Sequence, residues 1–206
     1  MKYQPNDLLK FLLRSRNLST IDRCSNTPHI QKYSVAEHSF YISFYSMIFA
    51  DLENSLTKKR EIYEFEDLYD TSEVIKRALI HDLEESITGD ILYPFKHNNA
   101  ELTCKLKEAI ENCVNKELFL ELPDELQIYY KLLWADSKDD SKEGQLVEAM
   151  DKFEILLYAI SEMEMGNVNS FKEIYTTAIN VIYLNHNNIK TLINVVDKIK
   201  EKYGDA

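Results

Sequence analysis

Glycine and proline, the two residues that most often interrupt regular backbone, are scarce in this chain. Each occurs 4 times in 206 residues, or about 2%, against usual frequencies of roughly 7% and 5%. The tight turns of a β-sandwich or β-barrel depend on these residues, so neither fold is favoured. The two commonest glycine-rich phosphate loops, G-x-G-x-x-G and G-x-x-x-x-G-K-[ST], are also absent from the sequence. We therefore expect an all-α protein, folded as a single helical bundle.

Apolar residues recur at helical spacing along most of the chain. The most regular stretch steps by 4, 3, 4 and 3 residues through Leu146, Met150, Phe153, Leu157 and Ile160. Residues 18–34 are polar and irregular and predict a long loop, which in compact domains is often functional. No repeat or change of composition marks a second domain, so residues 1–206 are expected to form one. The expected helices cover 6–17, 35–52, a segment opening at Asp70, 98–120, 123–134, 142–164, 170–184 and 187–203.

The net charge and the number of cysteines indicate which partners the protein can bind and in which cellular compartment it is found. Lys and Arg number 24 against 35 Asp and Glu, a net charge of −11, and such a surface repels nucleic acid and anionic membranes. Three cysteines form neither a C-x-x-C motif nor an even disulfide framework, which favours a reducing compartment. The first residues lack a signal-peptide core and no run approaches 18 apolar residues. We expect a cytoplasmic protein that binds neither nucleic acid nor membrane.

Two histidines and two aspartates on predicted helices are the candidate metal ligands: His38, His81, Asp82 and Asp151. The pair His81-Asp82 ends the apolar run 78–80, where an unpaired buried carboxylate would cost several kcal/mol. A divalent cation removes that cost, and imidazole and carboxylate are its ordinary ligands. Such a mixed site would leave coordination positions for water and substrate.

Each candidate also has a plain structural interpretation. His38 is equally well read as a hydrogen-bonded histidine facing the core. Asp151 could pair with Lys152 or Lys198, although the apolar residues at i−4 and i+4 place it beside the apolar stripe. The residues alone leave both interpretations open.

Three local motifs resemble one family. They are Ser34-Val-Ala-Glu-His38-Ser, His81-Asp-Leu-Glu-Glu85-Ser-Ile-Thr-Gly-Asp90 and Ala149-Met-Asp151-Lys. Together they match the H…HD…D signature of HD-domain metal-dependent phosphohydrolases. The residues around the signature positions are similar to those of the YfbR-like branch of bacterial 5'-deoxynucleotidases. The resemblance covers about residues 7–165, whereas 166–206 match only as generic helices. It implies an HD-type helical fold.

The resemblance also implies an activity and a cofactor. The activity is release of orthophosphate from (deoxy)nucleoside 5'-monophosphates, and the cofactor is one divalent ion, either Co, Mn, Mg or Zn. It assigns the ligand role to His38, His81, Asp82 and Asp151. Glu85 corresponds to the carboxylate that positions the attacking water or moves its proton, and Asp90 to a second acid near the leaving oxygen. Glu85 lies three residues after Asp82, so on a helix both could face one cavity; otherwise Glu85 is half of a solvated Glu-Glu pair.

The candidate substrate contacts are Arg23, Cys24 and Lys96, of which Lys96 is chosen as a cation near the motifs. Arg23 corresponds to the arginine that holds the phosphate, a role suited to a bidentate cation; on its own it could simply pair with Asp22. The family usually has Trp at the position of Cys24, and the smaller side chain puts deoxyribose selectivity in question. The interval between His38 and His81 is longer than usual and includes an acidic insertion at 61–70 to which the sequence assigns no role.

Two other functions stay open. One keeps the metal centre but cleaves triphosphate or pyrophosphate from nucleotides, which requires more cations than the few near the motifs: Arg23, Lys32, Arg77, Lys96 and His97. The other is an inert scaffold that binds a nucleotide or a protein, against which all four ligand residues are present. The resemblance leaves a homodimer open.

Overall fold

The structure, a computed structural model, describes residues 4–96 and 99–204. Over these ranges it is helical, and the backbone pairs in β fashion only at the isolated bridge between Asp22 and Ser34. None of the described helices is long and apolar enough to cross a membrane. The elements are α1 (Pro5–Ser15), η1 (Arg16–Thr20), α2 (Val35–Thr57), η2 (Phe65–Asp67), α3 (Thr71–Ile80), α4 (Glu85–Thr88), α5 (Tyr93–Lys96), α6 (Ala100–Cys113), η3 (Val114–Leu118), α7 (Asp124–Ala135), α8 (Lys142–Glu164), α9 (Val168–Asn185) and α10 (Lys190–Tyr203).

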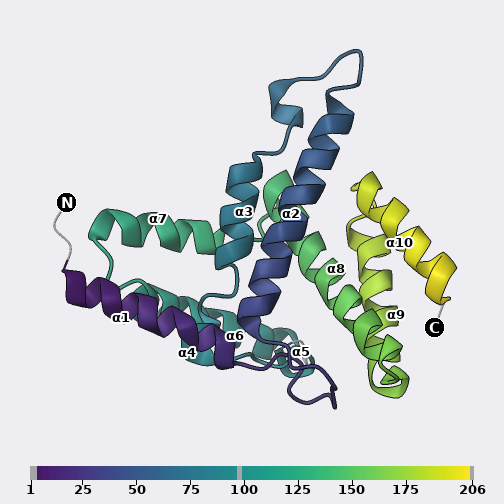
Figure 1. Ribbon diagram of the computed structural model, residues 1–206. Helices are drawn as coiled ribbons and strands as arrows, with labels where there is room; N and C mark the ends of the chain where they lie inside the picture. The colour runs from purple at the N-terminus through teal and green to yellow at the C-terminus, as the bar shows by residue number, and fades with distance from the viewer. Residues whose placement is uncertain (1–3, 97–98, 205–206) are drawn as a thin grey trace.

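The described residues form two apolar cores. The larger core joins α2 and α3 to α8, α9 and α10, and the smaller joins the end of α3 to α6, η3 and α7. In the view of Figure 1, α1, α6 and α7 extend to one side of α2, and α8, α9 and α10 to the other. The all-α fold expected from the sequence is confirmed.

The start of α2 is fixed by a capping box, and this start positions the first candidate ligand. The Ser34 hydroxyl accepts the backbone N–H of Glu37 at 3.2 Å, and the Glu37 carboxylate accepts the backbone N–H of Ser34 at 2.8 Å. Such reciprocal bonds satisfy two donors that a helix start otherwise leaves unpaired. His38 follows in the next turn and is fully buried.

Helix α8 spans the predicted residues 142–164. Ser141 caps it by accepting the backbone N–H of Gly144, and the predicted apolar stripe faces the larger core. Asp151 lies on the buried side of α8. Its predicted position beside the stripe is therefore confirmed.

Two local predictions need correction. His81 and Asp82 do not lie on a helix, because α3 ends at Ile80 and a turn of i+3 hydrogen bonds follows. The helix expected over 98–120 is divided into α6 and the π-helical turn η3.

The acidic segment 61–70 forms the tip of the connection between α2 and α3 (Figure 1). The Lys142 ammonium, at the start of α8, donates to the backbone carbonyls of Glu66 and Leu68. The backbone N–H of Tyr69 donates to Asn54 Oδ1 at 2.7 Å. These contacts tie the segment to α2 and α8.

Candidate metal centre

Three chain segments bring the four candidate ligands together near the N-terminal end of α2. His38 comes from the second turn of α2, His81 and Asp82 from the turn after α3, and Asp151 from the middle of α8. The turn orients His81, because its Nδ1 lies 2.7 Å from the Ala78 carbonyl, one of those left free at the end of α3. Since a carbonyl only accepts, Nδ1 carries the proton and Nε2 of His81 has a free lone pair.

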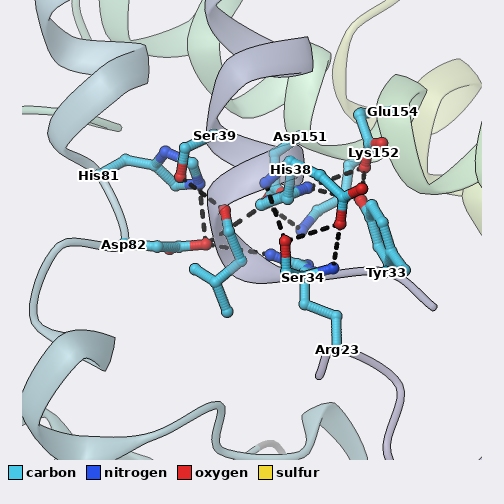
Figure 2. A network of polar contacts seen from close by, with 12 residues as sticks. Arg23, Tyr33, Ser34, His38, Ser39, His81, Asp82, Asp151, Lys152 and Glu154 are labelled. Carbon is cyan, nitrogen blue, oxygen red and sulfur yellow. Dashed lines mark hydrogen bonds and ion pairs between the residues drawn. The ribbon is translucent and has the colours of Figure 1, made fainter. Parts of the chain in front are cut away.

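The donor atoms of these residues converge (Figure 2). Those of His38, His81 and Asp82 all lie within 4.8 Å of one another. His38 Nε2 is 3.5 Å from Asp82 Oδ2 and 3.2 Å from Asp151 Oδ1, and His81 Nε2 is 2.9 Å from Asp82 Oδ2. Both Nε2 atoms are buried and make no hydrogen bond. Buried polar atoms without partners are unusual, and a cation between them and the carboxylates would satisfy both.

The charges of the three buried side chains suit a cation. Burial and the nearby Arg23 lower the pKa of His38 to about 4, so its imidazole is neutral. Burial alone would raise the pKa of Asp82, but His81 and Lys138 outweigh it and hold this pKa well below the usual range. In the same way Lys138 and Lys152 overcome burial at Asp151 and hold its pKa well below the usual range. Neutral imidazole and ionised carboxylate form a donor set for a divalent ion.

Asp151 is held by two lysines through one of its oxygens. Its Oδ2 accepts Lys138 Nζ at 2.8 Å and Lys152 Nζ at 3.1 Å, while Oδ1 faces His38. The alternative partner Lys198 instead pairs with Glu201. The lysines thus fix the carboxylate with one oxygen turned toward the centre.

Arg23 reaches the same centre from the loop between η1 and α2. Its Nη1 donates to Asp82 Oδ2 at 3.1 Å, so Asp82 is the carboxylate it pairs with, rather than Asp22. Burial by itself would lower the pKa of Arg23, but Asp82 and Asp151 outweigh this and raise it. The chain, although acidic overall, therefore presents a permanent cation at the candidate centre.

Glu85 and Asp90 lie beside the centre, and their pKa values are raised, whereas those of the ligands Asp82 and Asp151 are lowered. Burial and the neighbouring Asp82, opposed by Arg23, raise the pKa of Glu85 to about 10, and its Oε2 is buried without a hydrogen bond. Glu85 is therefore not a solvated surface residue. Burial also raises the pKa of Asp90, whose carboxylate accepts a backbone hydrogen bond from Cys24. Both carboxyls can hold a proton at neutral pH more readily than ordinary ones.

The remaining predicted contacts lie around Asp90. Cys24 has a left-handed backbone (φ 54°) and is half-buried. Lys96, at the end of α5, favours the ionised forms of Glu84 and Asp90, which places its charge on this side of the centre. Arg77 is engaged elsewhere, with Glu73 at 3.0 Å and Asp139 at 2.8 Å. His97 lies outside the described residues.

Sequence reasoning missed three residues that contact the ligands: Tyr33, Lys138 and Glu154. Glu154 follows Asp151 by three residues on α8, a spacing that places both on one side of the helix and could have identified it. Tyr33 and Lys138 lie in connections whose path is set by packing, and no local pattern marks them.

Comparison with known proteins places these residues in a family. The model of the 5'-deoxynucleotidase YfbR-like family matches residues 10–199. "5'-Deoxynucleotidase ECA3034" of Pectobacterium atrosepticum is 29% identical over 157 residues, which are 76% of this chain and 74% of the relative. "5'-Deoxynucleotidase PM0747" of Pasteurella multocida is 29% identical over 150 residues, 73% of this chain and 72% of the relative.

Solved structures agree on the fold. The crystal structure of an HD-domain phosphohydrolase (lin2634) from Listeria innocua superposes with a TM-score of 0.79 at 27% identity, covering 96% of this chain and 92% of that one. The PH0347 protein of Pyrococcus horikoshii superposes with a TM-score of 0.71 at 22% identity, covering 94% and 98%. A family match over nearly the whole length, together with the converging His and Asp side chains, leads to one conclusion. The chain belongs to the 5'-deoxynucleotidase YfbR-like family.

Proposed function

We propose that this protein is a divalent-metal-dependent phosphohydrolase that releases orthophosphate from nucleoside 5'-monophosphates. The observation that carries the proposal is the pair of buried, unpartnered Nε2 atoms of His38 and His81, which face the ionised carboxylates of Asp82 and Asp151. Relatives named as 5'-deoxynucleotidases support this choice of substrate. The four residues would hold the ion, which when bound activates water and polarises phosphoryl oxygens.

The surrounding side chains divide the remaining work. Arg23 holds the phosphate, because a guanidinium can bind two of its oxygens at once. Glu85 positions the attacking water or moves its proton, and Asp90 supplies a proton to the 5'-oxygen as the bond from phosphorus to that oxygen breaks. The raised pKa values of both carboxyls mean that each holds a proton more readily than an ordinary carboxyl does.

Cys24 lies beside Arg23 and Asp90, and we propose that it borders the sugar. A thiol leaves room where the family usually has Trp, so AMP and dAMP should be cleaved at more similar rates. Cys24→Trp should penalise AMP more than dAMP, because filling the space creates a clash with the 2'-hydroxyl. Strict deoxy-specificity of the native enzyme, unchanged in Cys24→Trp, would place sugar selection at another residue.

The assay that tests the function is product analysis of a nucleotide panel with Mn²⁺, Co²⁺, Mg²⁺ or Zn²⁺. We expect orthophosphate from monophosphates with at least one of these ions, and none after chelation or in Asp151→Asn. Release of triphosphate or pyrophosphate from dATP, without monophosphate cleavage, would support the other phosphohydrolase function. Nucleotide binding without any cleavage would support the inert scaffold.

Two further aspects, the compartment and the oligomeric state, belong to the same proposal. The absence of disulfides among Cys24, Cys104 and Cys113 is consistent with a reducing cytoplasm. The exposed aromatic side chains of Phe40 and Phe44 on α2 offer an apolar face for a homodimer, which size-exclusion chromatography with light scattering tests. A monomer at micromolar concentration would contradict the dimer.

A further inference from the structure

Behind the candidate centre, a buried carboxyl group contacts the far side of a metal ligand. Glu154 on α8 is 3% exposed, and its Oε2 lies 2.8 Å from His38 Nδ1. The Tyr33 hydroxyl donates to the same Oε2 and lies 2.8 Å from His38 Nδ1. Figure 2 shows Tyr33 and Glu154 on one side of His38 and Asp82 on the other.

Counting protons in this group fixes the tautomer of His38. The hydroxyl of Tyr33 has a single proton, which it gives to Glu154. When Oε2 of Glu154 carries no proton, no donor is left for His38 Nδ1, so Nδ1 itself carries a proton and donates it. The same count holds when a proton sits on Oε1, because Oε2 still accepts from both donors. His38 Nε2 then presents its lone pair toward Asp82 and Asp151.

We propose that Glu154, supported by Tyr33, is a positioning residue that holds His38 as its Nδ1–H tautomer with Nε2 turned toward the metal. The proposal rests on the metal centre proposed above. A hydrogen bond from the second ring nitrogen to a carboxylate fixes the ring and raises the basicity of a ligating histidine. The other histidine, His81, obtains the same orientation from the Ala78 carbonyl, so one ligand is supported by a side-chain carboxyl group and the other by the backbone.

Tyr33 also contacts Arg23, the proposed phosphate-binding residue, in the loop between η1 and α2. The Tyr33 ring stacks on the Tyr158 ring with centroids 4.1 Å apart. The guanidinium carbon of Arg23 lies 5.7 Å from the centroid of the Tyr33 ring. The backbone N–H of Arg23 donates to the Tyr33 carbonyl at 2.8 Å. The residue that supports His38 therefore also sets the position of Arg23.

The test uses metal affinity and imidazole tautomers rather than turnover. In the metal-free wild-type protein, ¹⁵N chemical shifts should assign His38 to the Nδ1–H tautomer; the Nε2–H tautomer would overturn the proposal. Glu154→Leu removes the acceptor and should weaken Mn²⁺ or Co²⁺ binding, measured by calorimetry, about 10–100-fold. Glu154→Gln keeps an acceptor oxygen and should recover most of this loss. Wild-type affinity in Glu154→Leu, or equal weakening in both variants, would overturn the proposal.

Glu53→Leu is the matched control. Glu53 on α2 also accepts two hydrogen bonds through one oxygen, from the N–H and hydroxyl of Thr191 at 3.0 and 2.6 Å. Its loss should lower stability but leave metal affinity and the His38 tautomer unchanged. If Glu154→Leu does not fold, the tautomer of the wild-type protein still decides. Tight metal binding that depends on Glu154, without phosphate release, would reject the proposed function and retain this inference.

Discussion

Three carboxyl groups at the candidate centre, Asp82, Glu85 and Asp151, are held in opposite protonation states. His81 and Lys138 outweigh burial at Asp82, and Lys138 and Lys152 outweigh it at Asp151, so both stay ionised. Burial and the neighbouring Asp82 dominate at Glu85 and keep it neutral. The difference follows from position, because Lys138 donates directly to Asp151, whereas Oε2 of Glu85 is buried without a hydrogen-bond partner. Groups whose pKa values diverge in this way are suited to separate roles, here ligand and proton carrier.

Replacing Glu85 by Gln should separate stability from activity. The folded protein holds the Glu85 proton more tightly than the unfolded chain, so stability falls as pH rises from the ordinary carboxyl range toward 10. Glu85→Gln removes this dependence, and the metal-free variant should melt at a higher temperature than wild type at pH 8, with the gap closing toward pH 5. Its turnover should fall by roughly 10²–10⁴-fold while metal affinity is kept.

Thermal melts at several pH values and calorimetric metal titration check both parts. Glu53→Gln, a carboxylate far from the centre, should show neither the pH-dependent gain nor the loss of rate. A metal-replete Glu85→Gln enzyme with full activity would remove Glu85 from proton transfer.

Replacing Arg23 by Ala should reduce catalysis more than stability. Loss of a charge-assisted phosphate contact of about 2–4 kcal/mol lowers kcat/KM by roughly 30–1000-fold. Arg14→Ala provides the comparison, because Arg14 binds Glu121 through two nitrogens at 2.7 and 2.6 Å and does not contact the centre. It should lower the melting temperature and leave kcat/KM near wild type. Steady-state kinetics with dAMP measures the contrast, and equal effects of the two variants would argue against a phosphate role.

At the scale of elements, one helix organises the site. Helix α8 carries the candidate ligand Asp151, the supporting Glu154 and, two turns later, Glu162. Glu162 accepts the backbone N–H groups of Ile30 and Gln31 at 2.8 and 2.7 Å. The same helix therefore positions a ligand and anchors the loop that carries Arg23.

Glu162→Ala should loosen this loop. Without its anchor the loop samples more conformations, so binding should weaken and KM for dAMP should rise more than kcat falls. Glu164→Ala, an exposed change at the end of the same helix, is the control and should leave both constants unchanged. A fall in kcat with an unchanged KM in Glu162→Ala would contradict the anchoring role.

The sequence predicted helices where the pattern was strong and failed where packing decides. Helix α8 was predicted at its observed bounds because its apolar steps are regular, and in the structure Ser141 caps its start. His81 and Asp82 were wrongly placed on a helix, since the apolar run before them continues the helical pattern and only tertiary contacts show that α3 stops at Ile80. The loop bearing Tyr33 has no periodicity, so its meeting with Glu154, 121 residues away along the chain, could not be foreseen.

At the scale of the whole molecule, metal binding should be visible as stability. A ligand present at 100 times its dissociation constant adds about 2.7 kcal/mol to the folded state, or roughly 5–10 °C for a chain of this length. Melting with Mn²⁺ against chelator measures this shift. We predict one cooperative transition in both conditions, as expected if residues 1–206 form one domain. No shift, or two separate transitions, would contradict a shared metal centre or a single domain.

The position of a bound ion tests the central claim most directly. Crystals grown with Mn²⁺ and measured for anomalous scattering should show one strong peak among His38 Nε2, His81 Nε2, Asp82 and Asp151. Contacts of about 2.0–2.3 Å to these nitrogens and oxygens are expected. The peak should disappear in Asp151→Asn crystals grown in the same way. A peak elsewhere, or none in a protein that hydrolyses dAMP with Mn²⁺, would contradict the account.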